Sequence, residues 1–267
     1  MRKIMIVFAA FAALVMVSCR QTKDLGKTKV PTGPAWYQNM TALESELATA
    51  IADAKVLTPS KISHTLMPIR KDWPGEEWKQ IDGRDMVLCV TLVDSSRLKR
   101  FFSGEGVYRM DRTNGTWITI PAEWKSKKKD FEGLDSVAAH MRMVQMYGLS
   151  PDCTYNIMVS FYADPKGMFR PSHDPDITTV SAPLDFPSNL KSDYTVGETN
   201  FMEWYKKSVY DAYEDDSPLP WTQLGYTYDW HKGANRQGLS EYIVTHHTLI
   251  KVASHESQWS FIKRITK

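Results

Sequence analysis

Hydrophobic and polar positions follow two different periods along this chain, and each period marks one kind of element. Apolar residues recur at helical spacing over 41–55, 133–148 and 201–213, which predicts a helix in each segment. The 85–94 segment is largely apolar and the 155–163 segment alternates, which predicts two strands. Because helices and strands interleave irregularly, we expect an α+β fold: a single domain with a twisted, mostly antiparallel sheet and several packed helices.

The first predicted helix carries clear start and stop signals. Thr41 and Glu44 have the spacing of a capping box, and Pro59 prevents the helix from continuing far beyond Lys55. Its apolar side chains fall on one face, which we expect to pack against the core: Leu43, Leu47, Ala50, Ile51 and Ala54.

Turn residues predict the connections in the middle of the chain. Asn114-Gly115 is a strong hairpin signal, and we expect strands at 106–112 and 116–121 on either side of it, with a longer loop as the alternative. The 96–102 segment is expected to form a short helical turn. The 164–187 segment is rich in proline and has little periodicity, so we expect a long ordered loop or a lid.

The C-terminal third of the chain has a strand-like pattern. The aromatic segment 220–230 predicts a strand around Gly225. We expect 239–244 and 248–253 to form the last strand pair, or one long strand with a bulge. The 259–262 segment is expected to add a final strand.

The N-terminus has a pattern of its own. Arg2 and Lys3 precede an apolar run of 14 residues, 4–17, and Ser18 is then followed by Cys19. The run is shorter than the roughly 20 residues that span a bilayer, and its charge and length are typical of a signal peptide. Because a cysteine directly follows the small residue, the segment resembles the signal of bacterial lipoproteins.

The lipoprotein resemblance implies a division of the chain and a location. It implies cleavage before Cys19, a diacylglycerol thioether on its sulfur and an acylated amino terminus. Residues 1–18 are then the signal peptide, 19–34 a flexible tether and 35–267 a single α+β domain. The lipid anchor would make a membrane one partner of the protein. The implied location is the bacterial cell envelope, at the outer membrane, with the periplasmic or surface face left open.

Composition narrows the classes of function. The whole chain has 33 Lys+Arg and 31 Asp+Glu, and removal of Arg2 and Lys3 with the signal leaves 31 of each. A net charge of zero argues against a nucleic-acid partner, because phosphate binding needs a cationic surplus. The aromatic content of 12%, with nine Trp, is high, and aromatic residues fill cores or line ligand grooves.

Two cysteines follow Cys19 in the sequence. Cys89 lies in the predicted 85–94 strand, and Cys153 follows a Ser-Pro-Asp turn. An envelope location permits a disulfide between them, but two free thiols are favoured. The sequence has no CxxC or HExxH motif and no His/Cys pair at zinc spacing, so we expect no metal site and no cofactor is evident.

Three short segments place polar groups among aromatic residues. They contain Arg109 in Val-Tyr-Arg, Thr227 in Tyr-Thr-Tyr, and Glu241 in Ser-Glu-Tyr-Ile-Val. Together these segments weakly resemble the ADP-ribosyltransferase superfamily and its NAD-hydrolysing relatives. The resemblance implies that Arg109 grips the dinucleotide, that Thr227 offers a hydroxyl and that Glu241 is the catalytic carboxylate.

This chemistry suits the residue types. Arginine recognises a pyrophosphate in a bidentate way, and a carboxylate stabilises the oxocarbenium-like ion that forms when the nicotinamide–ribose bond breaks. The favoured interpretation is nevertheless that Arg109 and Glu241 are structural or surface residues. Asp229 and Glu241 are a further candidate, a carboxylate pair for glycoside hydrolysis, whose separation the sequence does not determine.

The histidines give weaker candidates. His173, between Asp174 and Asp176, is a metal or acid–base candidate, but aspartates in proline-flanked turns more often hydrogen-bond the local backbone. His246 and His247 are adjacent on a predicted strand, so we expect their rings on opposite faces and no shared metal.

An aromatic platform is the last candidate site, made by Trp221, Tyr226, Tyr228 and Trp230. Side-chain alternation places the last three on one face of a strand. If exposed, they would bind sugar rings, peptidoglycan or a protein partner. If buried, they are part of the core, which is the favoured alternative.

We therefore expect a lipid-anchored envelope protein that binds an unknown protein or carbohydrate ligand and no nucleic acid. An NAD-glycohydrolase or ADP-ribosyltransferase-like enzyme is the alternative. The segments 146–152 and 224–230 also resemble those of secreted bacterial proteins, a likeness that implies no activity.

Overall fold

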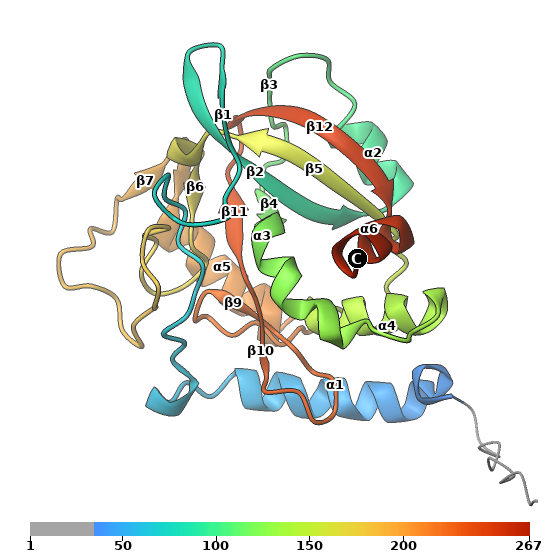
Figure 1. The fold of residues 1–267 in the computed structure, drawn as a ribbon. Helices are drawn as coiled ribbons and strands as arrows, with labels where there is room; N and C mark the ends of the chain where they lie inside the picture. The colour runs from blue at the N-terminus through green and yellow to red at the C-terminus, as the bar shows by residue number, and fades with distance from the viewer. Residues whose placement is uncertain (1–34) are drawn as a thin grey trace, which may run out of the picture. The chain divides into compact units, whose positions relative to one another are not determined.

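The largest element of the fold is a five-stranded sheet (Figure 1). The structure, a computed structural model, describes residues 35–267. The strand order is β1 (Trp78–Ile81), β2 (Arg84–Val93), β5 (Ile157–Ala163), β12 (Leu249–Ser257) and β3 (Tyr108–Arg109). Every strand pairing among the described residues is antiparallel. The predicted α+β fold is confirmed, and the 85–94 and 155–163 segments are its strands β2 and β5.

Both faces of this sheet are buried at its strands β2 and β5, which explains why β2 is apolar along most of its length. On one face, Cys89 belongs to the largest cluster of core side chains. On the other, Val90 and Met158 pack with side chains of α4 (Ser136–Met146) and α6 (Gln258–Ile265).

The remaining helices are α1 (Met40–Ala54), α2 (Ser95–Phe101), α3 (Pro121–Trp124) and α5 (Phe201–Tyr213), with 3₁₀ turns η1 (Trp36–Gln38), η2 (Pro59–Lys61), η3 (Lys125–Asp130) and η4 (Pro165–Gly167). Of these helices, α1, α2 and α5 were predicted and α3 was not. The N-cap of α1 is Asn39, whose side chain accepts a hydrogen bond from the Ala42 amide, so the cap lies before the predicted box. The apolar face of α1 packs on α4 and on Tyr228 and Trp230.

The Asn114-Gly115 turn does not join a hairpin, and that prediction was wrong. β3 pairs with β12, whereas β4 (Thr116–Ile118) pairs with β11 (Tyr242–Val244) in a second sheet, of order β4-β11-β6, where β6 is Met168–Phe169. The chain therefore changes sheets at this turn, because each flanking strand finds a buried partner from the C-terminal third. The other strands form two small two-stranded sheets: β9 (Tyr226–Tyr228) pairs with β10 (Gln237–Ser240), and β7 (Thr195–Val196) pairs with β8 (Thr199–Asn200).

Two predictions at the C-terminus were wrong. The segments 239–244 and 248–253 do not form a strand pair or one long strand, because β11 and β12 belong to different sheets. The 259–262 segment is part of α6, whose start is capped by the Ser257 hydroxyl accepting from the Ser260 amide. Gln258, Phe261 and Ile262 are buried at helical spacing, which a strand would not produce.

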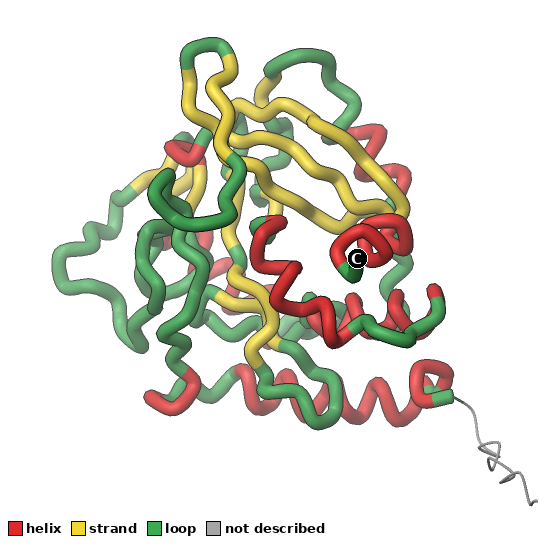
Figure 2. Tube along the Cα trace, viewed as in Figure 1, coloured by secondary structure: helices red, strands yellow, loops and turns green. Residues whose placement is uncertain are grey.

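The 164–187 segment is a long ordered loop, in agreement with the prediction, and Figure 2 shows how much loop lies between β6 and α5. The side chain that holds this loop in place is Arg170, which is fully buried. The Arg170 guanidinium donates hydrogen bonds to the carbonyl oxygens of Asp176 (3.2 Å) and Thr179 (2.7 Å). A Cβ at Gly225 would lie 2.6 Å from Arg170 Cδ, so this close approach requires glycine.

The predicted signal peptide, the lipidated Cys19 and the tether 19–34 lie outside the described residues. Within 35–267, no helix has the length and apolar character needed to cross a membrane. Cys89 and Cys153 are both free thiols, so the alternative of a bridge between them is not realised. Burial raises the pKa of both thiols, which makes them poor nucleophiles.

Candidate functional site

A cavity of about 410 Å³ opens between α5, β4 and the loop that leads into β9. Its aromatic wall consists of Trp117 on β4, Trp204 on α5 and Trp221. The three indoles contact one another, with ring centroids 5.8 Å apart for Trp117 and Trp204, and 6.1 Å from each of these to Trp221. Trp117 is 38% exposed and Trp221 is 7% exposed, so the wall leads from the surface into the interior. The size is that of a small-molecule site.

Glu241 lies at the buried end of this cavity. It occupies the break between β10 and β11, where its amide donates to the Gly225 carbonyl (3.0 Å). The residue is 5% exposed, and neither Glu241 Oε1 nor Trp221 Nε1 has a hydrogen-bond partner. Glu241 and Trp221 thus both line the cavity, and each carries a buried polar atom that no other residue of the described chain hydrogen-bonds.

Burial sets the protonation state of this carboxyl. Desolvation raises the pKa of Glu241 to about 8, while the neighbouring Trp221 indole and the positive charge of Arg170 act in the opposite direction. At pH 7 the carboxyl is therefore mostly neutral. In that state it can donate one hydrogen bond and accept others.

Charged side chains also line the cavity. They are three cations, Arg97, Arg112 and Lys207, and one anion, Asp211. Arg97 forms an ion pair with Asp94, and Lys207 forms one with Asp211. Among residues 35–267, Arg112 has neither an ion-pair nor a side-chain hydrogen-bond partner.

Arg112 is also partly withdrawn from water. Burial, and next the positive charge of Arg97, lower the pKa of the Arg112 guanidinium, which still remains charged at neutral pH. A half-buried guanidinium without an anion is a ready binding group for a carboxylate or phosphate.

The three residues of the ADP-ribosyltransferase resemblance do not all meet. Thr227 and Glu241 line the same cavity. Arg109 does not line it: it lies exposed on the edge strand β3 and donates to the His247 carbonyl (3.1 Å). Arg112, three residues further on, does line the cavity, as does Arg97.

The Thr227 hydroxyl has a structural role. It donates to the Met146 carbonyl (2.6 Å) and accepts from the Leu239 amide (2.9 Å). These bonds tie β9 to β10 and to the end of α4. The hydroxyl thus already acts as a donor and as an acceptor within the protein, and its one proton is not available to a ligand.

The predicted aromatic platform is not exposed, and the alternative of core residues is correct. Tyr226, Tyr228 and Trp230 are 5%, 3% and 0% exposed. Their polar atoms are satisfied by the protein, as when Tyr228 donates to Asp53 Oδ2 (2.8 Å) and Trp230 Nε1 to the Leu149 carbonyl (2.9 Å). Helix α1 packs on two of them, which the local alternation of the strand does not reveal. Trp221 and Tyr228 do line the cavity.

Asp229 and His173, two further candidate site residues, have structural roles in the core. Asp229 pairs with Arg142 and does not line the cavity, so it does not form a catalytic pair with Glu241. His173 is buried beside Tyr205 and Phe186, and burial lowers its pKa. It is a neutral core histidine.

Sequence reasoning missed Trp117, Trp204 and Arg112 as site residues. The three come from separate segments, and only the high tryptophan content hinted at an aromatic site. No family model, no curated protein and no solved structure matches this chain.

Proposed function

We propose that this chain is a lipid-anchored cell-envelope protein that binds a small acidic sugar in the tryptophan-lined cavity. The observation that carries the proposal is the unpaired Arg112 guanidinium in the same cavity as the buried, unpartnered carboxyl of Glu241. The envelope location continues the lipoprotein resemblance of the N-terminal segment that ends at Cys19.

Each part of the cavity fits one part of such a ligand. The apolar C–H face of a sugar ring packs against indole rings, here Trp117, Trp204 and Trp221. Ring hydroxyls pair with Glu241 and with Trp221 Nε1, which otherwise stay unsatisfied in the interior. The carboxylate of the sugar binds Arg112.

The neutral state of Glu241 favours an anionic ligand. A charged carboxylate at the buried end would repel a second carboxylate in the same cavity, whereas the protonated form does not. The raised pKa of about 8 keeps the group neutral at pH 7. An acidic ligand and a buried glutamate are thus compatible in this one cavity.

Tryptophan fluorescence of purified residues 20–267 tests the proposal. The probes are glucuronic acid and N-acetylmuramic acid, each compared with its neutral counterpart, glucose or N-acetylglucosamine. We expect the acidic probes to change the fluorescence saturably and to bind about 10- to 100-fold more tightly than the neutral ones, because an ionic hydrogen bond contributes about 1.5–3 kcal/mol. Equal affinity for both sets, or no saturable change, would reject an acidic-sugar site.

Arg112→Gln is expected to weaken the acidic probe about 10- to 100-fold and to leave neutral sugars unaffected. The matched control is Arg100→Gln, because Arg100 is exposed and does not line the cavity. Titration of both variants with glucuronic acid checks this. If both weaken binding equally, the effect comes from overall charge and not from a site.

The affinity for the acidic probe is expected to fall as the pH rises through about 8. Below that value Glu241 is mostly neutral, and above it the new carboxylate repels the ligand. Titrations from pH 6 to 9 measure this, and the Glu241→Gln variant should show a flat profile over the same range. A profile that falls equally in the variant would assign the titration to another group.

The enzyme alternative keeps one supporting observation: Glu241 lies in a cavity that aromatic rings also line. Hydrolysis of NAD would consume water and release nicotinamide, which is measured directly with the same protein. Turnover that is lost in Glu241→Gln would favour this alternative. Arg109 would have no part in it, since its side chain is on β3 outside the cavity.

A further inference from the structure

The adjacency of His246 and His247 predicted that their rings project to opposite faces of a strand, and that prediction was wrong. They lie in the turn between β11 and β12, where His247 adopts a left-handed backbone conformation (φ +62°). The two rings consequently stack, with centroids 3.7 Å apart and an interplanar angle of 29°. Nitrogen atoms of both rings are therefore available on one side of the turn.

Backbone hydrogen bonds bring Asp111 to this pair. The Met110 amide donates to the Thr248 carbonyl (2.9 Å), and the His247 amide donates to the Met110 carbonyl (2.8 Å). These bonds fix the residue that follows Met110 beside the turn. One ligand atom from each of Asp111, His246 and His247 lies within 4.8 Å of the other two.

The ring nitrogens have the surroundings of metal ligands. His246 Nδ1 is buried, has no hydrogen-bond partner, and lies 3.9 Å from Asp111 Oδ1. His247 Nδ1 lies 3.0 Å from both carboxylate oxygens of Glu198. A proton on this nitrogen satisfies Glu198 and leaves Nε2 as the basic nitrogen, which is the arrangement of carboxylate, histidine and metal seen in zinc sites.

We propose that Asp111, His246 and His247 bind a divalent transition-metal ion, with Zn²⁺ as the best-fitting member of the class. Two imidazoles and one carboxylate are the donor set that zinc accepts in three-ligand sites. The Asp111 side chain is 89% exposed and His247 is 38% exposed, so the fourth position faces water. None of these residues lines the tryptophan cavity, so the site is independent of the proposed sugar binding.

Competition of metal-free residues 20–267 with a zinc-chelating dye tests the site. We expect one Zn²⁺ per chain, with binding at least 10-fold weaker in Asp111→Asn and in His246→Gln, because each variant removes one ligand. Glu198→Gln should weaken binding about 10-fold through His247. The matched control is His255→Gln: His255 is exposed on β12 outside the cluster, and its loss should change nothing.

Thermal unfolding separates loss of the site from loss of the fold. Zn²⁺ should raise the melting temperature of the wild type, since it binds only the folded chain, and should not raise that of Asp111→Asn. Asp111 is exposed, so this variant should melt with the wild type when no metal is present. Wild-type affinity no greater than that of Asp111→Asn, or an equal loss in His255→Gln, would overturn the proposal.

Discussion

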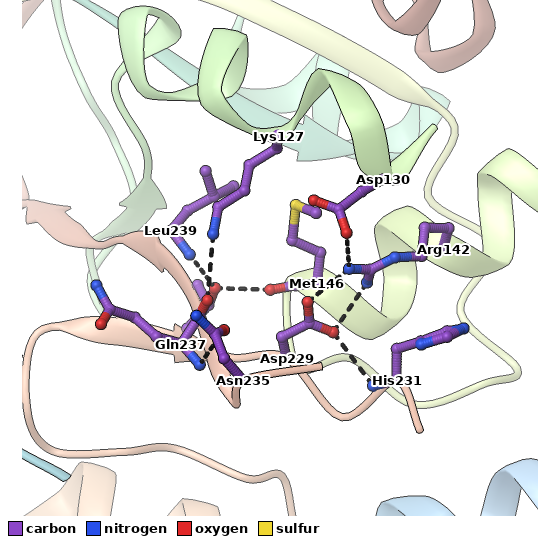
Figure 3. A network of polar contacts seen from close by, with 10 residues as sticks. Lys127, Asp130, Arg142, Met146, Asp229, His231, Asn235, Gln237 and Leu239 are labelled. Carbon is purple, nitrogen blue, oxygen red and sulfur yellow. Dashed lines mark hydrogen bonds and ion pairs between the residues drawn. The ribbon is translucent and has the colours of Figure 1, made fainter. Parts of the chain in front are cut away.

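Replacement of Arg142 by alanine is expected to lower the free energy of unfolding by about 3–5 kcal/mol. Arg142 projects from α4 and bonds both oxygens of Asp229, at 2.8 and 2.6 Å, and Oδ1 of Asp130 at 2.8 Å (Figure 3). The side chains of Arg142 and Asp229 are only 5% and 4% exposed. Removal of the guanidinium leaves the Asp229 carboxylate buried without its cation.

Thermal and denaturant unfolding measure this effect. A loss of 3–5 kcal/mol in a domain of this size corresponds to a fall in melting temperature of about 6–20 °C. The matched control is Arg264→Ala, which breaks the Arg264–Glu256 pair at the surface, where the Arg264 side chain is 57% exposed. That change should cost about 0–1 kcal/mol. Equal losses in the two variants would show that burial of the Arg142 pair contributes nothing.

A double replacement distinguishes the charge from the packing. Arg142→Met with Asp229→Leu removes both buried charges and keeps apolar volume at the site. Such exchanges are often neutral or stabilising, so the double variant should be more stable than Arg142→Ala alone. A double variant as unstable as the single one would assign the loss to other contacts, such as the His231 amide that donates to Asp229 Oδ1 (3.1 Å).

The parts of the fold that the sequence predicted well are those with strong local periodicity. The expected helix over 201–213 is α5, and the helix over 41–55 is α1 with its apolar face in the core. In each, the burial of one face follows from spacing within the segment, and no distant partner is needed to recognise it. β2 was also predicted, because a strand buried on both faces is apolar throughout.

The errors arose where a partner distant in the sequence decides the structure. The Asn114-Gly115 turn has hairpin chemistry, but its flanking strands pair with β12 and β11, more than a hundred residues later. The 259–262 segment is too short for its period to distinguish a strand from a helix. His247 turns the chain with a positive φ, which few non-glycine residues adopt. The neighbouring residues in the sequence give no signal that predicts this turn.

The candidate site was only partly predictable for the same reason. Glu241 was predicted as a candidate catalytic carboxylate and Trp221 as part of an aromatic platform, and both line the cavity. Arg109 and Arg112 have similar local surroundings in the sequence, yet β3 holds the first at a sheet edge while the second reaches the cavity. Local pattern also could not reveal that α1 buries Tyr228 and Trp230.

Replacement of Glu241 by glutamine is expected to stabilise the protein at alkaline pH, with a gain that grows between about pH 4.5 and pH 8. Burial raises the pKa of Glu241 from 4.5 to about 8 in the folded state. At low pH the carboxyl is protonated in both the folded and the unfolded chain, so it makes no pH-dependent contribution to the free energy of unfolding. As the pH rises, the unfolded chain ionises first and is stabilised, and the folded state loses relative stability until its own carboxyl ionises near pH 8.

Glutamine has nearly the shape of the neutral carboxyl and does not titrate, so the variant escapes this loss. The gain above pH 8 should be about 3–5 kcal/mol, since each pKa unit corresponds to about 1.36 kcal/mol. Denaturant unfolding of wild type and variant at pH 5, 7 and 8.5 measures it, with Glu44→Gln on the exposed side of α1 as the control. Glu76, whose burial raises its pKa to about 7, titrates in both proteins and therefore cancels in their difference. A difference between wild type and Glu241→Gln that stays constant across this range would contradict a buried, neutral Glu241, and with it the pH dependence expected for the acidic ligand.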